Sequence, residues 1–249
     1  MRVEHVMGMP VLVDVRDPEV DPDAVERVFD WLRSVDAVFS TYLVDSEISR
    51  LNRGELALAD AHPDVREVLD RCEELRLETG GYFDVHAPSP GEVDPSGLVK
   101  GWSVDRAALI LDEAGARNYS INAGGDIRVR GRAVPGDAWR VGIQHPLQRD
   151  KIATVVQAND LAIATSGAYE RGEHIVDPLT GRAPDGVLSV TVTGPDLATA
   201  DAYATAAYAM GPDAGPAWTA RLAGYEAMTI LADERVLSTP RFPALRDAI

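Results

Sequence analysis

A succession of short strand-like segments fills the chain between residues 119 and 192, and no helical pattern interrupts it. Apolar and polar residues alternate in these segments, and Gly, Pro or Asp separates one from the next. Parallel neighbouring strands need long crossover connections, which are usually helices. We therefore predict an α+β fold with mixed, largely antiparallel sheets. The predicted strands are residues 11–15, 119–123, 127–129, 139–143, 152–156, 161–165, 187–192 and 227–231.

Helical periodicity is confined to other parts of the chain. Over residues 21–39 the apolar side chains recur every three or four positions, with Asp21 as the N-cap and Pro22 at the first helical position. This pattern predicts an amphipathic helix. Further helices are predicted over residues 64–79, 99–114 and 197–210, the last of them rich in alanine.

The balance of charges narrows the possible partners. The chain of 249 residues has 40 acidic and 24 basic residues, which gives a formal net charge of −16. No run of Lys and Arg occurs, so nucleic acid and anionic membrane surfaces are not expected partners. An acidic protein that binds a polyphosphate would need a metal ion or a few well-placed cations to offset the repulsion.

Length and composition indicate one globular unit. We expect a single domain over residues 1–249, with a Pro- and Gly-rich loop at residues 88–97 separating two lobes. The only cysteine, Cys72, excludes an internal disulfide framework or thiolate metal site. No window approaches the ~20 apolar residues of a membrane span, and the chain starts without a leader pattern, so a cytoplasmic location is expected.

A small-residue loop at 94–101 enters the third predicted helix and carries Lys100. Backbone N–H groups at such a helix start, together with a lysine, suit an anion such as phosphate. An ordinary helix start with a solvated lysine explains the same residues. The segment 122–126 has two adjacent glycines between strands, which either admit a ligand or merely form a hairpin turn.

A third segment, residues 164–182, gathers hydroxyls, two arginines and His174 directly after a predicted strand. An imidazole with an ordinary pKa near 6.5 suits a general base, although a lone histidine is often structural. Asp201 and Thr205 lie four residues apart on one face of the alanine-rich helix. Their hard oxygens suit Mg²⁺, although Asp201 facing solvent and Thr205 bonding to its own helix would produce the same spacing.

The order of these motifs resembles the ApbE family of FAD:protein FMN transferases, and the resemblance spans nearly the whole chain. This order is more specific than any single motif. The segments that match are Met7-Gly8 (family Met-Gly-Thr), 39–42 with 46–52 ("STY…SELSRLN"), 79–84 ("TGGAFD"), 94–105 ("DLSAIAKGYAVD"), 122–126 ("NLGGD"), 139–143 ("WRVGI"), 164–171 ("ATSGDYER"), 174–182 ("HIIDPRTGR") and 201–205 ("DALAT").

The resemblance implies an enzyme that splits the pyrophosphate of FAD, releases AMP and joins FMN to a Thr or Ser hydroxyl of an acceptor flavoprotein. It implies His174 as the base that activates this hydroxyl, and Gly97, Asp201 and Thr205 as the Mg²⁺ site. Tyr42 would stack on the isoalloxazine ring. The complete set of implied FAD-binding residues is Met7, Tyr42, Lys100, Asp105, Asn122, Gly124, Gly125, Asp126, Ser166 and Gly167.

The sequence departs from the family pattern at two places. Met9 replaces the threonine of Met-Gly-Thr, and the segment around His86 differs from the usual continuation. We expect an altered flavin pocket wall there, with His86 within possible reach of the ligand. An FAD pyrophosphatase that gives FMN and AMP, or a flavin-binding protein without turnover, would fit the same residues.

Overall fold

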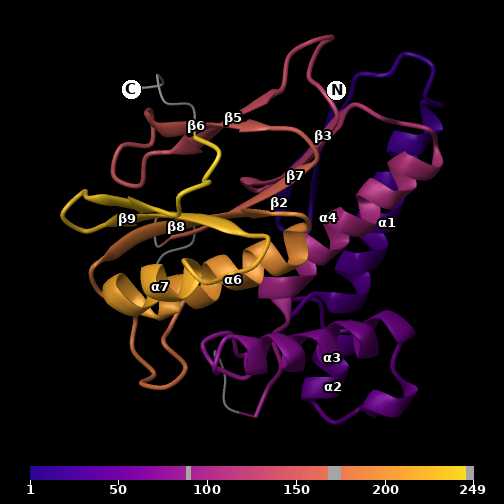
Figure 1. The fold of residues 1–249 in the computed structure, drawn as a ribbon. Coiled ribbons are helices and arrows are strands. Elements are labelled where there is room, and N and C mark those ends of the chain that lie inside the picture. Colours follow the sequence, from indigo (N-terminus) through magenta and orange to yellow (C-terminus); the bar gives the residue numbers. More distant parts are fainter. Residues whose placement is uncertain (88–90, 168–174, 245–249) are drawn as a thin grey trace.

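The computed structural model describes residues 1–87, 91–167 and 175–244 and has an eight-stranded sheet at its centre (Figure 1). The strand order is β1-β2-β3-β4-β7-β8-β9-β10, and every pair of strands in the described ranges is antiparallel. A separate two-stranded sheet consists of β5 and β6. The bounds are β1 Arg2–Val6, β2 Met9–Val15, β3 Tyr119–Ala123, β4 Asp126–Arg130, β5 Trp139–Gln144, β6 Ile152–Ala158, β7 Leu161–Gly167, β8 Val187–Gly194, β9 Glu226–Leu231 and β10 Val236–Ser238.

The predicted helices are present, with shifted ends. The third begins at Ser96, three residues before its predicted start, so the end of the predicted 88–97 loop is helical. The structure adds β1, β10, α2 and α7, which the sequence reading did not identify. The helices are α1 Asp23–Phe39, α2 Glu47–Asn52, α3 Pro63–Glu78, α4 Ser96–Glu113, α6 Leu197–Ala209 and α7 Gly211–Thr219, with a short 3-10 turn at Leu58–Asp60.

Helices and a small sheet cover opposite faces of the main sheet. On one face α1, α4 and α6 pack onto the sheet, and residues such as Phe29, Leu111 and Ile121 are completely buried between the layers. On the other face lies β5–β6, where Trp139 packs with Ile163 and Ile230. Figure 1 shows this arrangement, with α6 and α7 on one side of β8 and β9 and with β5 and β6 on the other.

The helices α2 and α3 form a further cluster that extends from the main sheet (Figure 1). Val65, Val68 and Leu75 of α3 are fully buried in it, against Leu98 of α4 and Ala206 of α6. One long helix, α4, thus contributes to both hydrophobic clusters. The predicted lobe boundary near residues 88–97 stays a prediction.

The junction of α4 with α6 is unusually close. A Cβ atom built on Gly101 would lie 2.6 Å from the carbonyl oxygen of Leu197, which only a glycine avoids. One turn later, Asp105 accepts hydrogen bonds from the backbone N–H groups of Leu197 and Ala198 at 2.7 and 2.9 Å. These contacts fix the first turn of α6 against the middle of α4.

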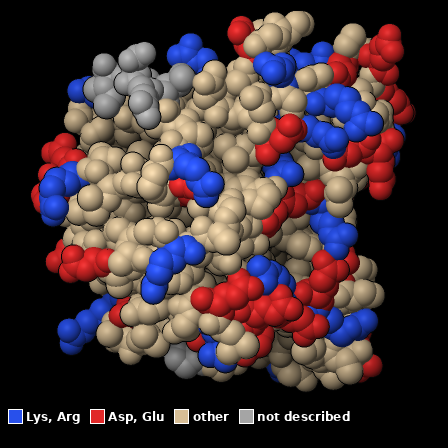
Figure 2. Space-filling view, in the orientation of Figure 1, with Lys and Arg blue, Asp and Glu red and all other residues tan. Residues whose placement is uncertain are grey.

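Basic and acidic side chains are intermixed on the surface. On the face in Figure 2, Lys and Arg lie scattered among Asp and Glu and form no continuous basic patch. Within the described ranges, no helix combines the length and the apolarity that a bilayer crossing requires.

Candidate functional site

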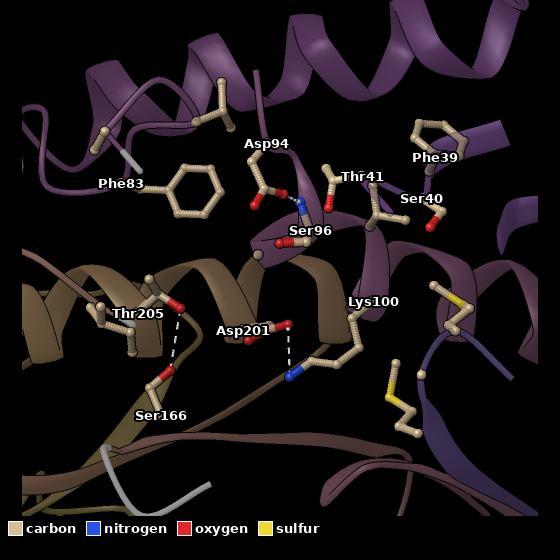
Figure 3. A pocket seen from close by; sticks show the side chains of 18 of the residues that line it. Phe39, Ser40, Thr41, Phe83, Asp94, Ser96, Lys100, Ser166, Asp201 and Thr205 are labelled. Carbon is tan, nitrogen blue, oxygen red and sulfur yellow. Dashed lines mark hydrogen bonds and ion pairs between the residues drawn. The ribbon is translucent and has the colours of Figure 1, made fainter. Parts of the chain in front are cut away.

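A cavity of about 700 Å³ opens where α4 and α6 meet the ends of several strands (Figure 3). Its walls come from the β1–β2 turn, the segment after α1, the first turns of α4, the end of β7 and the middle of α6. Most of the predicted site residues that the structure describes line it. These residues are Met7, Tyr42, Gly97, Lys100, Ser166, Gly167, Asp201 and Thr205.

Lys100 joins two buried carboxylates, of which Asp201 lines the cavity and Asp126 is not among the lining residues. Its Nζ lies 2.5 Å from Oδ2 of Asp126 and 3.5 Å from Oδ2 of Asp201. The side chains of Asp126 and Asp201 are only 2% and 4% exposed, and that of Lys100 is 18% exposed. Buried carboxylates require a compensating charge, and Lys100 supplies one to both.

The hairpin of β3 and β4 explains why Asp126 reaches this position. Gly124 and Gly125 form its two-residue turn with φ values of 59° and 103°, and the Gly125 N–H donates to Oδ1 of Asn122 at 3.0 Å. Positive φ at both turn positions favours glycine. Asp126 follows the turn at once, and its Oδ1 accepts the N–H of Thr165 on β7 at 3.0 Å.

This geometry shows the structural role of the two adjacent glycines. Asn122, Gly124 and Gly125 are not among the described residues that line the cavity, and the sulfur of Met9, which does line it, lies 3.0 Å from a Cβ built on Gly124. Their observed role is to form the turn that presents Asp126. Direct contact of these three residues with a nucleotide stays a prediction.

Asp105 also lies outside the cavity lining. It holds the start of α6 and is 3.9 Å from the guanidinium of Arg128. Burial raises its pKa to about 6, since the loss of hydration outweighs the two backbone N–H groups and the nearby arginine. The structure therefore gives Asp105 a supporting position, and its contact with the nucleotide stays a prediction.

The proposed metal residues lie together on the cavity wall. Asp201 and Thr205 project from the same face of α6, and Thr205 Oγ1 is 3.2 Å from Oγ of Ser166 (Figure 3). Gly97 lies in the first turn of α4, on the wall facing α6. A carboxylate, a hydroxyl and a main-chain carbonyl are hard oxygen donors, and Mg²⁺ is commonly held by few protein groups together with water and phosphate. The donor set therefore fits Mg²⁺.

His174 lies outside the described residues, so its position relative to the cavity is not part of the structure. Ile175 and Val176, which follow it directly, line the cavity. Tyr42 stands at the mouth and is 95% exposed, as an aromatic side chain available for stacking would be. His86 is not among the lining residues, and its Nδ1 lies 3.1 Å from the carbonyl oxygen of Glu92.

A family model described as the ApbE family matches residues 7–90 and 86–229. The chain belongs to the ApbE family. A FAD:protein FMN transferase of Vibrio cholerae serotype O1 is 35% identical over 175 residues, which cover 66% of this chain and 52% of that relative. One of Haemophilus influenzae is 27% identical over 251 residues, covering 76% of this chain and 72% of the relative. The chain thus spans about half the length of the Vibrio relative.

Solved structures of family members share the fold. The flavin transferase ApbE from Vibrio cholerae superposes with a TM-score of 0.85 at 26% identity, covering 98% of each chain. An ApbE protein from Thermotoga maritima superposes with a TM-score of 0.87 at 21% identity, covering 97% of each chain, and supports the fold alone. The predicted α+β class with antiparallel sheets is confirmed.

The structure adds cavity residues that the motif reading did not assign. Phe83 is 4% exposed, and its ring lies against Gly97, 3.2 Å from a Cβ built there. Ser40, Thr41, Asp94 and Met9 also face the cavity. Phe83, Asp94 and Thr41 belong to the matched segments 79–84, 94–105 and 39–42, so their place in these motifs was a usable signal.

Proposed function

We propose that this chain is a FAD:protein FMN transferase, which moves FMN from FAD to a Thr or Ser hydroxyl of an acceptor protein and releases AMP. The relatives described above carry this activity in their names. The observation that carries the proposal is the convergence of Lys100, Asp201 and Thr205 on one cavity, with the exposed ring of Tyr42 at its mouth.

Different groups would bind the flavin ring and the phosphates of FAD. Tyr42 would stack on the flavin ring, since aromatic faces favour offset stacking. Lys100 would contact the pyrophosphate with a cation on a flexible stem. Asp201, Thr205 and the carbonyl of Gly97 would hold Mg²⁺, which when bound supplies positive charge to the phosphates. Lys100 and Mg²⁺ together would offset the repulsion between the acidic chain and the phosphates of FAD.

In the proposed reaction the acceptor hydroxyl oxygen bonds to the phosphorus of the FMN half, and the bridging P–O bond of FAD breaks. AMP leaves with the bridging oxygen, and the proton of the hydroxyl passes to the imidazole of His174. A general base of this type contributes about 10²–10⁴-fold to the rate. Orientation by the cavity walls and charge stabilisation supply the rest of the acceleration.

The test is to incubate the protein with FAD and a threonine-containing acceptor domain, with and without Mg²⁺, and to follow AMP release and acceptor mass. The proposal expects metal-dependent AMP release together with an FMN-sized mass gain. AMP release without the mass gain in any acceptor would replace it with a pyrophosphatase, and intact FAD under every condition would replace it with a flavin-binding protein.

Two variants assign the roles. His174→Ala is expected to reduce transfer by about 10²–10⁴-fold while FAD binding persists, and His5→Ala on the exposed side of β1 is the matched control. Asp201→Ala is expected to raise the Mg²⁺ concentration needed for half-maximal rate. Unchanged transfer in the first variant, or an unchanged metal titration in the second, would remove that residue from its role.

A further inference from the structure

The trio of Lys100, Asp126 and Asp201 is asymmetric. Lys100 Nζ is 2.5 Å from Asp126 and 3.5 Å from Asp201. Asp126 is also anchored, because its second oxygen accepts the N–H of Thr165 on the neighbouring strand. A lysine side chain has four rotatable methylene groups, whereas a carboxylate fixed to a strand cannot follow it. The contact with Asp201 is therefore the one that can be given up at the lower cost.

The carboxylate of Asp201 can interact with two different cations in this arrangement. Its carboxylate is a candidate metal ligand, and the same Oδ2 atom lies within ion-pair distance of an ammonium group. A divalent cation at Asp201 would lie close to Lys100 in a site where the side chains are 4% and 18% exposed. Like charges repel strongly where water is largely excluded.

We propose that Lys100 is a built-in counter-ion that competes with the divalent metal for Asp201, and that Asp126 holds it away from the metal when the site fills. This inference rests on the proposed function and deepens it, since it makes metal and FAD binding mutually dependent. Lys100 leaves Asp201 when metal binds, stays within reach of Asp126, and offers its remaining N–H groups to the pyrophosphate.

The charges of the trio show why the two ligands need each other. Two carboxylates and one ammonium sum to −1. The FAD pyrophosphate, with two negative charges, would bring the sum to −3, whereas a divalent cation alone would bring it to +1. With both bound the sum returns to −1. Each ligand therefore lowers the electrostatic cost of the other, and linkage requires the effect to be reciprocal.

The experiment measures Mn²⁺ binding to the FAD-free protein by electron paramagnetic resonance titration, so that no transfer reaction is involved. Removing the competing ammonium in Lys100→Met is expected to tighten Mn²⁺ binding by about tenfold. Lys151→Met is the matched control, because Lys151 is exposed in the turn before β6 and loses the same charge. Its Mn²⁺ affinity is expected to remain within about twofold of the wild type.

Asp126→Asn tests the second half of the proposal. Lys100 then has Asp201 as its nearer carboxylate, so Mn²⁺ binding is expected to weaken several-fold, and this loss is expected to shrink in the Lys100→Met background. Equal losses in both backgrounds would mean that Asp126 binds the metal itself, which would overturn its assigned role. Thermal unfolding of each variant confirms that the fold is retained.

The Mn²⁺ titration of Lys100→Met tests the competition directly. Weaker or unchanged Mn²⁺ binding in Lys100→Met overturns the competition, as does the absence of Mn²⁺ binding to the FAD-free protein. Asp201→Asn separates the two levels of the argument. If it leaves Mn²⁺ binding intact, the metal site in the proposed function is wrong; if it abolishes binding while Lys100→Met has no effect, only the counter-ion inference fails.

Discussion

Gly101 sits at the closest approach of α4 and α6, and replacing it with alanine tests the frame of the site. A Cβ at this position would be 2.6 Å from the carbonyl oxygen of Leu197, and 2.7 Å from both its carbonyl carbon and the Cα of Ala198. These are backbone atoms of the first turn of α6, which is itself held by Asp105. The contact can be relieved only if one helix moves.

The expected cost follows from two opposing effects. Forcing an extra methyl group into a packed junction costs about 1–3 kcal/mol, and contacts with backbone place this case at the upper end. Alanine in place of glycine within a helix returns about 1 kcal/mol. The net loss of about 2 kcal/mol corresponds to a fall in Tm of about 4–8 °C for a domain of this size.

The assay is thermal unfolding followed by circular dichroism, with Gly97→Ala as the matched control. Gly97 lies on the same helix, but a Cβ there would meet the ring of Phe83 at 3.2 Å, and a side chain can give way. Its Tm is expected to remain within about 3 °C of the wild type. A Gly101→Ala protein as stable as the control would refute the claim that the close backbone approach requires glycine.

Three further predictions follow from single side chains. Burial raises the pKa of Asp105 from 3.8 to about 6, so the ionised form is disfavoured in the folded state. The contribution of this group to the free energy of unfolding is therefore full below pH ~4 and is lost as the pH rises through ~6. Asp105→Asn is expected to remove up to about 3 kcal/mol of this pH dependence, as measured by urea unfolding from pH 4 to 7, and identical slopes in both proteins would contradict the assignment. Burial raises the pKa of Cys72 to about 12, so native protein is expected to react with a thiol reagent at pH 8 at least about 100-fold more slowly than unfolded protein; comparable rates would show that the thiol is accessible. Tyr42→Ala is expected to weaken FAD binding by about tenfold in a fluorescence titration, whereas Tyr42→Phe keeps the ring and the affinity, and a loss in both variants would exclude stacking.

The helices and strands with strong periodicity could be predicted from the sequence, and those without it could not. The helix at α1 shows a regular apolar face, and the structure starts it at Asp23, within two residues of the predicted start. The helix α4 starts three residues before the periodicity indicates, because Ser96 and Gly97 are residue types typical of loops. The helix α7 contains Pro216 and two glycines, so intrinsic propensity argued against it.

The pairing of the strands could not be predicted from the periodicity of the sequence. Alternation shows that a segment is a strand but not which strand lies beside it. The strand β7 pairs with β4 although the β5–β6 hairpin lies between them in the chain. The strand β2 pairs with β3 although the helices α1, α2, α3 and α4 lie between them in the chain. These contacts are decided by burial of the common face under α1, α4 and α6.

In the candidate site, local spacing predicted that Asp201 and Thr205 share one helix face. It did not predict which residues from other helices and strands lie beside them. Asp201 and Thr205 line the cavity as their four-residue interval indicated. The link from Lys100 to Asp126 joins a helix to a strand, and nothing in either motif alone indicates an ion pair. Asp201 comes within ion-pair distance of Lys100 where α4 and α6 approach closely at Gly101, and Asp126 reaches Lys100 from the β3–β4 hairpin.

Motif membership therefore does not distinguish residues that line the cavity from residues that support them. Asp105 and Lys100 belong to the same motif, yet Asp105 caps α6 outside the cavity lining, whereas Lys100 lines the cavity and pairs with two carboxylates. Likewise, the Gly124-Gly125 turn and Asp126 are adjacent, and only the aspartate takes part in the charged trio. A site that places a lysine between two buried carboxylates tolerates little displacement, because an unpaired charge there would cost several kcal/mol. Substitution of the residues that fix the supporting elements is therefore expected to disturb the charged trio as well.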